Sequence, residues 1–190
     1  MDFIREEEVA DLLNGFGISR VPDGEDCVLL AMDEARVAAR ACFYAEGGEC
    51  PCDEDCTCTA VPPDRLASTI DASLHRLHQG QSVLLPVGKW RSVFDAVAFS
   101  LAGDEAWQEF ESAATVELNT RDPLLLDSTD VHVLTSLLRA LMDDGDQAQQ
   151  GVFLVTAGAP VLMHLHPGGS IRFWFGDRVH ADELAEVHVG

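Results

Sequence analysis

Four cysteines lie within nine residues of this 190-residue chain, in the order Cys50, Cys52, Cys56 and Cys58. Their spacing, C-x-C-x3-C-x-C, is symmetric about Glu54. If the segment folds as a hairpin with Glu54 at its tip, Cys52 faces Cys56 and Cys50 faces Cys58. Because side chains alternate along a strand, all four sulfurs then project from one face, with opposed Cβ atoms about 4.5–5.5 Å apart. The spacing predicts a metal site built from these four thiolates.

Zinc is the metal that such a site favours, because Zn²⁺ is held tetrahedrally by four sulfurs at about 2.3 Å. Copper(I) and iron–sulfur clusters use the same ligands and stay as alternatives. Four cysteines fill the coordination sphere, which indicates a structural site rather than a catalytic one. Two cross-strand disulfides or free thiols in a solvated loop are the competing interpretations, and a reducing cytosol disfavours disulfides.

Three other cysteine or histidine features carry weaker predictions. His75 and His78, three residues apart on the helix expected after the cysteines, form an alternative donor set. Cys27 and Cys42 are expected to be small buried apolar residues. His164 and His166 share one face of a predicted strand and could ligate a metal. A solvent-facing pair without chemistry is the competing interpretation of these two histidines.

The densest basic spot is Lys89 and Arg91, which flank Trp90 just before a predicted helix. An anion could dock there on the helix N-terminus. Alternatively, the two cations pair with the protein's own carboxylates while Trp90 packs as an anchor. The chain holds no phosphate-binding loop, nucleophile elbow or H-E-x-x-H motif. The sequence therefore predicts a non-enzymatic interaction or regulatory module, with an enzyme using His164 and His166 as an alternative.

Charge excludes some partners: 33 Asp and Glu against 12 Lys and Arg give a net charge of −21. A basic face for nucleic acid or an anionic membrane is excluded, so we expect a protein partner. The acidic residues run along the whole chain, which is typical of a host with high internal salt or with a GC-rich genome. An acidic mimic of nucleic acid that inhibits a DNA- or RNA-binding partner is the alternative function. The acidic N-terminus and the interruption of the longest apolar run at Gly158 and Pro160 predict a soluble, cytoplasmic protein.

The order of expected helices and strands predicts an α+β protein. We expect a single domain over residues 1–190, with a cysteine-rich loop at 46–61. Apolar spacing and stop signals predict helices at 3–14, 62–80, 92–101 and 104–112, and a further helix beginning at 128–130. The alanine-rich residues 33–44 fit a helix or a strand, and a helix is favoured. Strands are expected at 27–32, 83–87 and 114–118. Strand-like runs at 152–156, 161–166 and 171–175, separated by short turns, predict a C-terminal antiparallel meander. The expected architecture is an antiparallel sheet with helices packed on one side.

Overall fold

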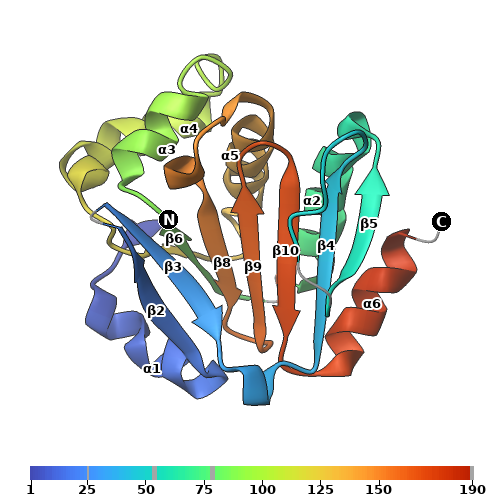
Figure 1. The fold of residues 1–190 in the computed structure, drawn as a ribbon. Helices are drawn as coiled ribbons and strands as arrows, with labels where there is room; N and C mark the ends of the chain where they lie inside the picture. Colours follow the sequence, from blue (N-terminus) through green and yellow to red (C-terminus); the bar gives the residue numbers. More distant parts are fainter. Residues whose placement is uncertain (25, 53–54, 78–79, 189–190) are drawn as a thin grey trace.

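A computed structural model describes residues 1–24, 26–52, 55–77 and 80–188 of the chain and centres on an eight-stranded sheet (Figure 1). The strands, in their order across the sheet, are β1 (Asp2–Phe3), β7 (Leu124–Leu126), β6 (Ser82–Pro86), β8 (Val152–Thr156), β9 (Val161–His166), β10 (Ser170–Phe175), β4 (Ala39–Ala45) and β5 (Thr57–Val61). All pairings are antiparallel except that of β4 with β5, which is parallel.

The predicted C-terminal meander is confirmed as β8, β9 and β10, which pair consecutively. Its second turn holds Gly168 and Gly169, whose positive φ values of 92° and 95° are readily adopted only by glycine. Strand β10 also pairs along its whole length with β4, so the meander connects the centre of the sheet to the cysteine-bearing strands.

Five helices cover one face of the sheet, which confirms the predicted α+β class, and only α1 of the described α-helices packs on the other face (Figure 1). They are α2 (Pro63–Leu77), α3 (Trp90–Val97), α4 (Glu105–Ala113), α5 (Val131–Asp144) and α6 (Arg178–His188). The main core lies between these helices and the sheet, and Trp90 and Trp107 are its largest fully buried side chains. Among the described residues, no helix has the length and apolar character needed to cross a bilayer.

The opposite face of the sheet is covered over only part of its width. Helix α1 (Glu6–Phe16) and the two-stranded sheet formed by β2 (Ile18–Asp23) and β3 (Cys27–Met32) lie over β6 and β8. Val9 and Leu30 from these elements form a second core with Leu85 and Leu162 of the large sheet. Over β10, β4 and β5, the same face carries Arg172, Cys42 and Cys58 at paired positions.

Two predicted elements are wrong. Residues 33–44, expected as a helix, form a short 3-10 helix, η1 (Glu34–Arg36), followed by β4. Asp33 begins η1 by accepting a hydrogen bond from the Ala35 amide at 3.0 Å. The helix propensity of the alanines is overridden because pairing with β10 buries Cys42 on one face of the strand and Phe43 on the other.

Residues 114–118, expected as a strand, instead form the 3-10 helix η2 (Ala114–Asn119), which continues directly from α4. The alternation of apolar residues here does not mark a buried face, because Val116 is 81% exposed.

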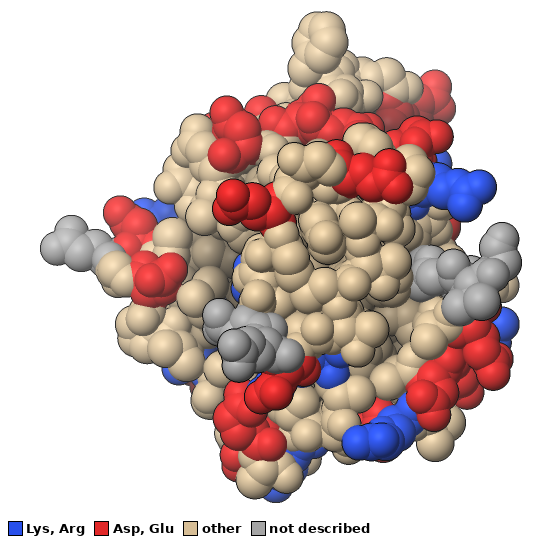
Figure 2. Space-filling model, turned by 45° about the vertical axis from the view of Figure 1, so that its right-hand side comes forward, with Lys and Arg blue, Asp and Glu red and all other residues tan. Residues whose placement is uncertain are grey.

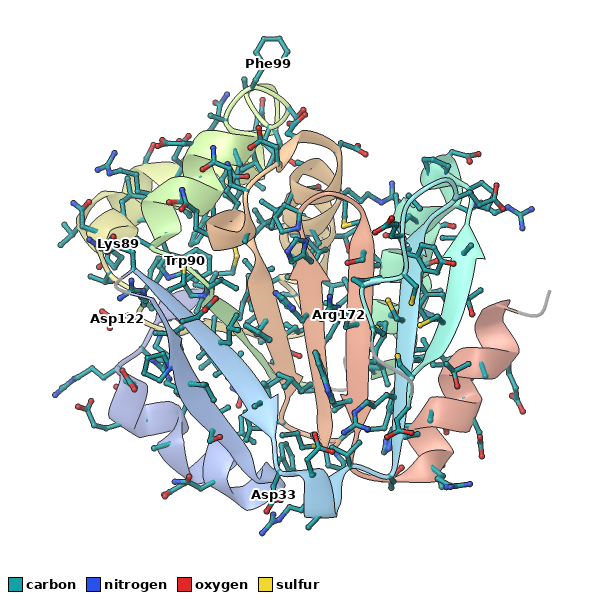
Figure 3. All side chains as sticks on the ribbon, viewed as in Figure 1. Asp33, Lys89, Trp90, Phe99, Asp122 and Arg172 are labelled. Atoms are coloured by element: carbon teal, nitrogen blue, oxygen red, sulfur yellow. The ribbon has the colours of Figure 1, made fainter. Side chains whose placement is uncertain are left out.

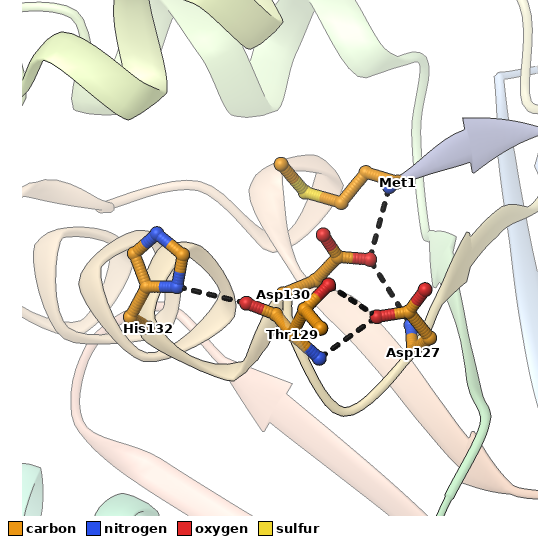
Figure 4. Close-up of polar contacts among 5 residues, drawn as sticks. All are labelled: Met1, Asp127, Thr129, Asp130 and His132. Atoms are coloured by element: carbon orange, nitrogen blue, oxygen red, sulfur yellow. Dashed lines mark hydrogen bonds and ion pairs between the residues drawn. The ribbon is translucent and has the colours of Figure 1, made fainter.

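Helix α5 begins at a polar turn that also holds the chain's N-terminus (Figure 4). The Met1 ammonium lies 2.9 Å from the Asp130 carboxylate, which accepts a hydrogen bond from the Asp127 amide at 3.0 Å. Thr129 donates to Asp127 from its amide and its hydroxyl, at 2.8 and 2.6 Å. The Thr129 hydroxyl hydrogen bond is the largest cause of the lowered pKa of Asp127. The His132 Nδ1–H donates to the Thr129 carbonyl at 3.0 Å, so the turn fixes the predicted start of this helix.

Candidate metal centre and the adjoining cleft

Parallel pairing of β4 with β5 sets Cys42 directly beside Cys58 at the end of the large sheet. Side chains alternate along β4, so Phe43 enters the core under the helices while Cys42 projects from the other face. The connection between the two strands carries Cys50, Cys52 and Cys56 back across this face. Strand pairing and a crossing loop thus bring together cysteines that are up to sixteen positions apart.

The sulfurs of Cys42, Cys52 and Cys58 all lie within 4.8 Å of one another. Cys52 is close enough to influence the pKa of Cys42, Cys50 and Cys56, so the outer cysteines adjoin the same cluster. A tetrahedral zinc ion at about 2.3 Å from each sulfur needs sulfurs about 3.8 Å apart. The three closest sulfurs therefore need to shift by only a fraction of their present separation to hold one ion.

The pKa values of Cys42, Cys56 and Cys58, the inner thiols of the cluster, are raised, so these thiols hold their protons at neutral pH. Burial is the largest cause that raises the pKa of Cys42 and of Cys56, and it raises the pKa of Cys58 to about 11. Cys50 is exposed, and its pKa is lowered, chiefly by the hydrogen bond from Cys58. A metal bound here must displace protons from the inner thiols, because only thiolates ligate well.

The structure changes the predicted arrangement of the cysteines in one respect. Cys58 lies on a strand that pairs with β4, and not with the segment of Cys50 and Cys52 as the expected hairpin required. The expected tip falls on residues 53 and 54, which lie outside the described residues. Long-range parallel pairing, invisible to the symmetric spacing, replaces local antiparallel pairing.

Cys42 is the functional residue that the sequence interpretation missed. It is fully buried, as expected of a small apolar residue, yet its sulfur belongs to the cluster. A correct assignment of residues 39–45 as a strand would have placed it on the same face as Cys58. Cys27 packs partly buried beside the second core, in line with its predicted apolar role. All six cysteines are free thiols.

A line of side chains crosses the sheet beside the cluster. Phe153, His164, Arg172, Cys42 and Cys58 occupy paired positions on β8, β9, β10, β4 and β5. Figure 3 shows Arg172 near the middle of this face. In the sheet register, it lies between His164 on β9 and Cys42 on β4. The thiols therefore lie at one end of a polar strip, not in isolation.

An open cleft of about 1060 Å³ lies where this strip meets the cysteine-bearing loop. Its walls come from the sheet face, from η1 and from the loop. They include Glu34, Arg40, Pro51, Cys52, Asp55, Cys56, Arg172 and Trp174. Asp and Glu side chains follow the margins of the face that Figure 2 turns forward, and residues of other types occupy the area between them. Two arginines lining one cleft therefore stand out in this acidic protein.

The two meander histidines share a face, as predicted, with ring centroids 5.8 Å apart. His164 is buried at 7% exposure and stacks on Phe153 at 4.1 Å, so it is not the solvent-facing residue of the competing interpretation. Burial is the largest cause that lowers its pKa to about 3. In the described part of the chain, the group of potential ligands that lie close enough to hold a metal contains cysteines and not these histidines.

The remaining predicted site residues lie elsewhere. His75 is exposed on α2, which covers the opposite face of the sheet, and His78 falls outside the described residues. Lys89 and Arg91 are exposed at the start of α3, where Arg91 donates to the Asn119 side chain at 3.2 Å. Trp90 is fully buried and donates from its indole to the Asp122 carbonyl at 2.8 Å. Trp90 is therefore the anchor that the alternative interpretation describes.

Comparison with known proteins does not assign the chain to a family. No family model matches the chain, and no curated protein or solved structure matches it either.

Proposed function

We propose that the cysteine cluster binds one zinc ion through Cys42, Cys52 and Cys58, with Cys56 as the fourth ligand. The observation that carries this proposal is the mutual approach of the first three sulfurs within 4.8 Å. Cys56 is less exposed than Cys50, and Cys52 and Cys58 both influence its pKa, so it suits the inner position. Four sulfur ligands complete the tetrahedral shell of zinc.

The proposed role of the ion is structural. It ties the loop between β4 and β5 to the sheet, because Cys52 and Cys56 come from the loop while Cys42 and Cys58 come from the strands. We infer that the protein acts as a non-enzymatic interaction or regulatory module, with this fixed loop as part of its binding surface. The net charge of −21 favours a protein partner over nucleic acid or an anionic membrane. A reducing compartment such as the cytoplasm suits six free thiols.

Elemental analysis of protein purified under reducing conditions tests the metal site. We expect about one equivalent of zinc per chain, and the same measurement identifies copper or iron if either is the natural ion. Cys42→Ser, Cys52→Ser and Cys58→Ser are each expected to lower the zinc content severely. Cys27→Ser is the matched control and should retain zinc, because Cys27 lies beside the other core. Less than about a tenth of an equivalent of any of the three metals in the wild type contradicts the proposal.

Variants of the two outer cysteines identify the fourth ligand. Cys56→Ser should lose zinc to a chelator faster than Cys50→Ser, because Cys50 is outside the proposed shell. Removal of zinc from the wild type should lower the free energy of unfolding by about 2.7 kcal/mol relative to protein in free zinc at a hundred times its dissociation constant. An equal effect of chelator on the metal-free triple variant of Cys42, Cys52 and Cys58 would show that the stabilisation comes from another site.

A further inference from the structure

The cleft beside the cysteines contains a cation, Arg172, that has no ion-pair partner among the residues that the structure describes. The Arg172 Nε is shielded from solvent without a hydrogen-bond partner. No acidic side chain of the described chain lies within ion-pair distance of its guanidinium. Arg20, Arg40 and Arg139 each form an ion pair with an acidic side chain. Arg121 also has a shielded Nε without a hydrogen-bond partner in the described chain, but its guanidinium donates to the Asp26 carbonyl. A guanidinium held partly out of water and left unpaired indicates that an anion binds there.

We propose that the cleft binds a small organic monocarboxylate, with Arg172 as the residue that receives the carboxylate. The planar guanidinium offers two parallel N–H donors that match the two oxygens of a carboxylate. Arg40, on the neighbouring strand, is already paired with Glu34 and leaves Arg172 as the available cation.

The walls of the cleft restrict the charge and shape of this ligand. Glu34 and Asp55 line the same space, so a multiply charged anion such as a phosphate monoester meets repulsion that a monoanion meets less. Trp174, two residues from Arg172 and on the same face of β10, is half-buried and presents an aromatic wall. A carboxylate with an apolar or aromatic body therefore fits the chemistry of the cleft. At about 1060 Å³, the cleft has room for a molecule of metabolite size.

This inference does not require the zinc ion. A zinc ion held by four thiolates carries a net negative charge, and Arg172 lies beside Cys42 in the sheet register. Arg172 could then act only as a counter-charge to the metal centre, in which case the cleft has no affinity for carboxylates. The experiment has to separate these two roles.

Benzoate serves as the probe, and benzamide, which has the same shape without the charge, is its matched comparison. Binding is followed by calorimetry and by tryptophan fluorescence. The fluorescence reports on the cleft because Trp174 lines it, whereas Trp90 and Trp107 are buried in the main core at 0% and 1% exposure. We expect saturable binding of benzoate and much weaker binding of benzamide. Arg172→Gln should weaken benzoate binding at least about tenfold, since it removes charge-assisted hydrogen bonds. Arg172→Lys should be intermediate, because it keeps the charge and loses the fork.

Arg91→Gln is the control, since Arg91 lies at the start of α3 on the helix-covered face; it should bind benzoate like the wild type. The inference is overturned if the wild type shows no saturable binding, if benzamide binds as tightly as benzoate, or if folded Arg172→Gln retains full affinity. Zinc content is measured on every sample. Benzoate binding without zinc removes the metal proposal and leaves this one, whereas zinc without benzoate binding leaves Arg172 as the counter-charge alone.

Discussion

The face of the sheet opposite the five helices has two halves that differ in what they bury. Over β6 and β8, α1 and the β2–β3 hairpin cover apolar side chains such as Leu85 and Leu162. Over β10, β4 and β5, the same face carries Cys42, Arg172 and Trp174 around an open cleft. One hydrogen-bonded sheet continues from β6 to β5 across both halves, so the difference comes from the side chains and from the elements that cover them.

The two halves differ in how much their residues contribute to the stability of the fold. The covered half removes apolar surface from water, which is the main source of folding free energy. The open half places thiols, and a guanidinium without an acidic partner in the described part of the chain, at positions where apolar residues would pack. Such groups contribute little to stability. Strand β9 lies at the boundary and contributes to both halves: Leu162 is part of the second core, and His164, two residues later, is part of the polar strip.

The largest effect is expected in the covered half. Leu162→Ala should lower the free energy of unfolding by about 2–5 kcal/mol, because Leu162 is fully buried and its truncation leaves a cavity. Denaturant unfolding measures the change. Leu162→Met, which keeps the volume, should cost less than about 1.5 kcal/mol. A loss below 1 kcal/mol for the alanine variant, roughly a typical surface effect, would mean that this half is not a packed core.

The two halves also differ in how far the sequence predicted them. The meander was predicted closely, because short turns and alternating apolar residues fix β8, β9 and β10 by local pairing. The cysteine-bearing region was predicted from its spacing alone. Four of the cysteines in the cluster were identified, but Cys42 and the partner strand of Cys58 were not.

The missing information was the parallel pairing of β4 with β5, which depends on contacts made across an intervening loop. Alanine-rich residues 39–45 favour a helix locally, and only pairing with β10 makes them a strand. Arg172 was missed for a related reason. Its significance comes from the absence of a carboxylate partner within the described chain, which no spacing rule reports.

A smaller effect, dependent on pH, is expected at the boundary between the halves. The pKa of His164 is lowered to about 3 by burial, with His166 and Arg172 as further causes, whereas the unfolded chain binds this proton near pH 6.5. Below pH 6.5 the unfolded state therefore holds a proton that the folded state lacks, and stability falls as the pH falls. The contribution is about 1.4 kcal/mol per pH unit between pH 6 and pH 4.

Replacement of His164 by leucine tests this contribution. The difference in unfolding free energy between His164→Leu and the wild type should grow in favour of the variant as the pH falls from 6 to 4. The same difference should stay constant between pH 7 and pH 8, where the imidazole is neutral in both states. If the unfolding free energies of the variant and the wild type change in parallel between pH 6 and pH 4, the folded state takes up the His164 proton as easily as the unfolded state. His164 would then be accessible to protons, like the residues of the open half.

The smallest expected effect has the opposite sign and lies in the open half. Arg172→Met, in protein freed of zinc and of carboxylates, should leave stability unchanged or raise it by up to about 1 kcal/mol. Methionine keeps the packing of the apolar stem while it removes a partly desolvated cation that has no acidic partner among the described residues. The exposed pair of Arg139 with Asp71 provides the contrast, since Arg139→Met should lower stability by up to about 1 kcal/mol. Midpoints of urea unfolding compare the two variants. A clear loss for Arg172→Met would mean that the fold itself satisfies this guanidinium, and the open half would then be a structural region like the covered one.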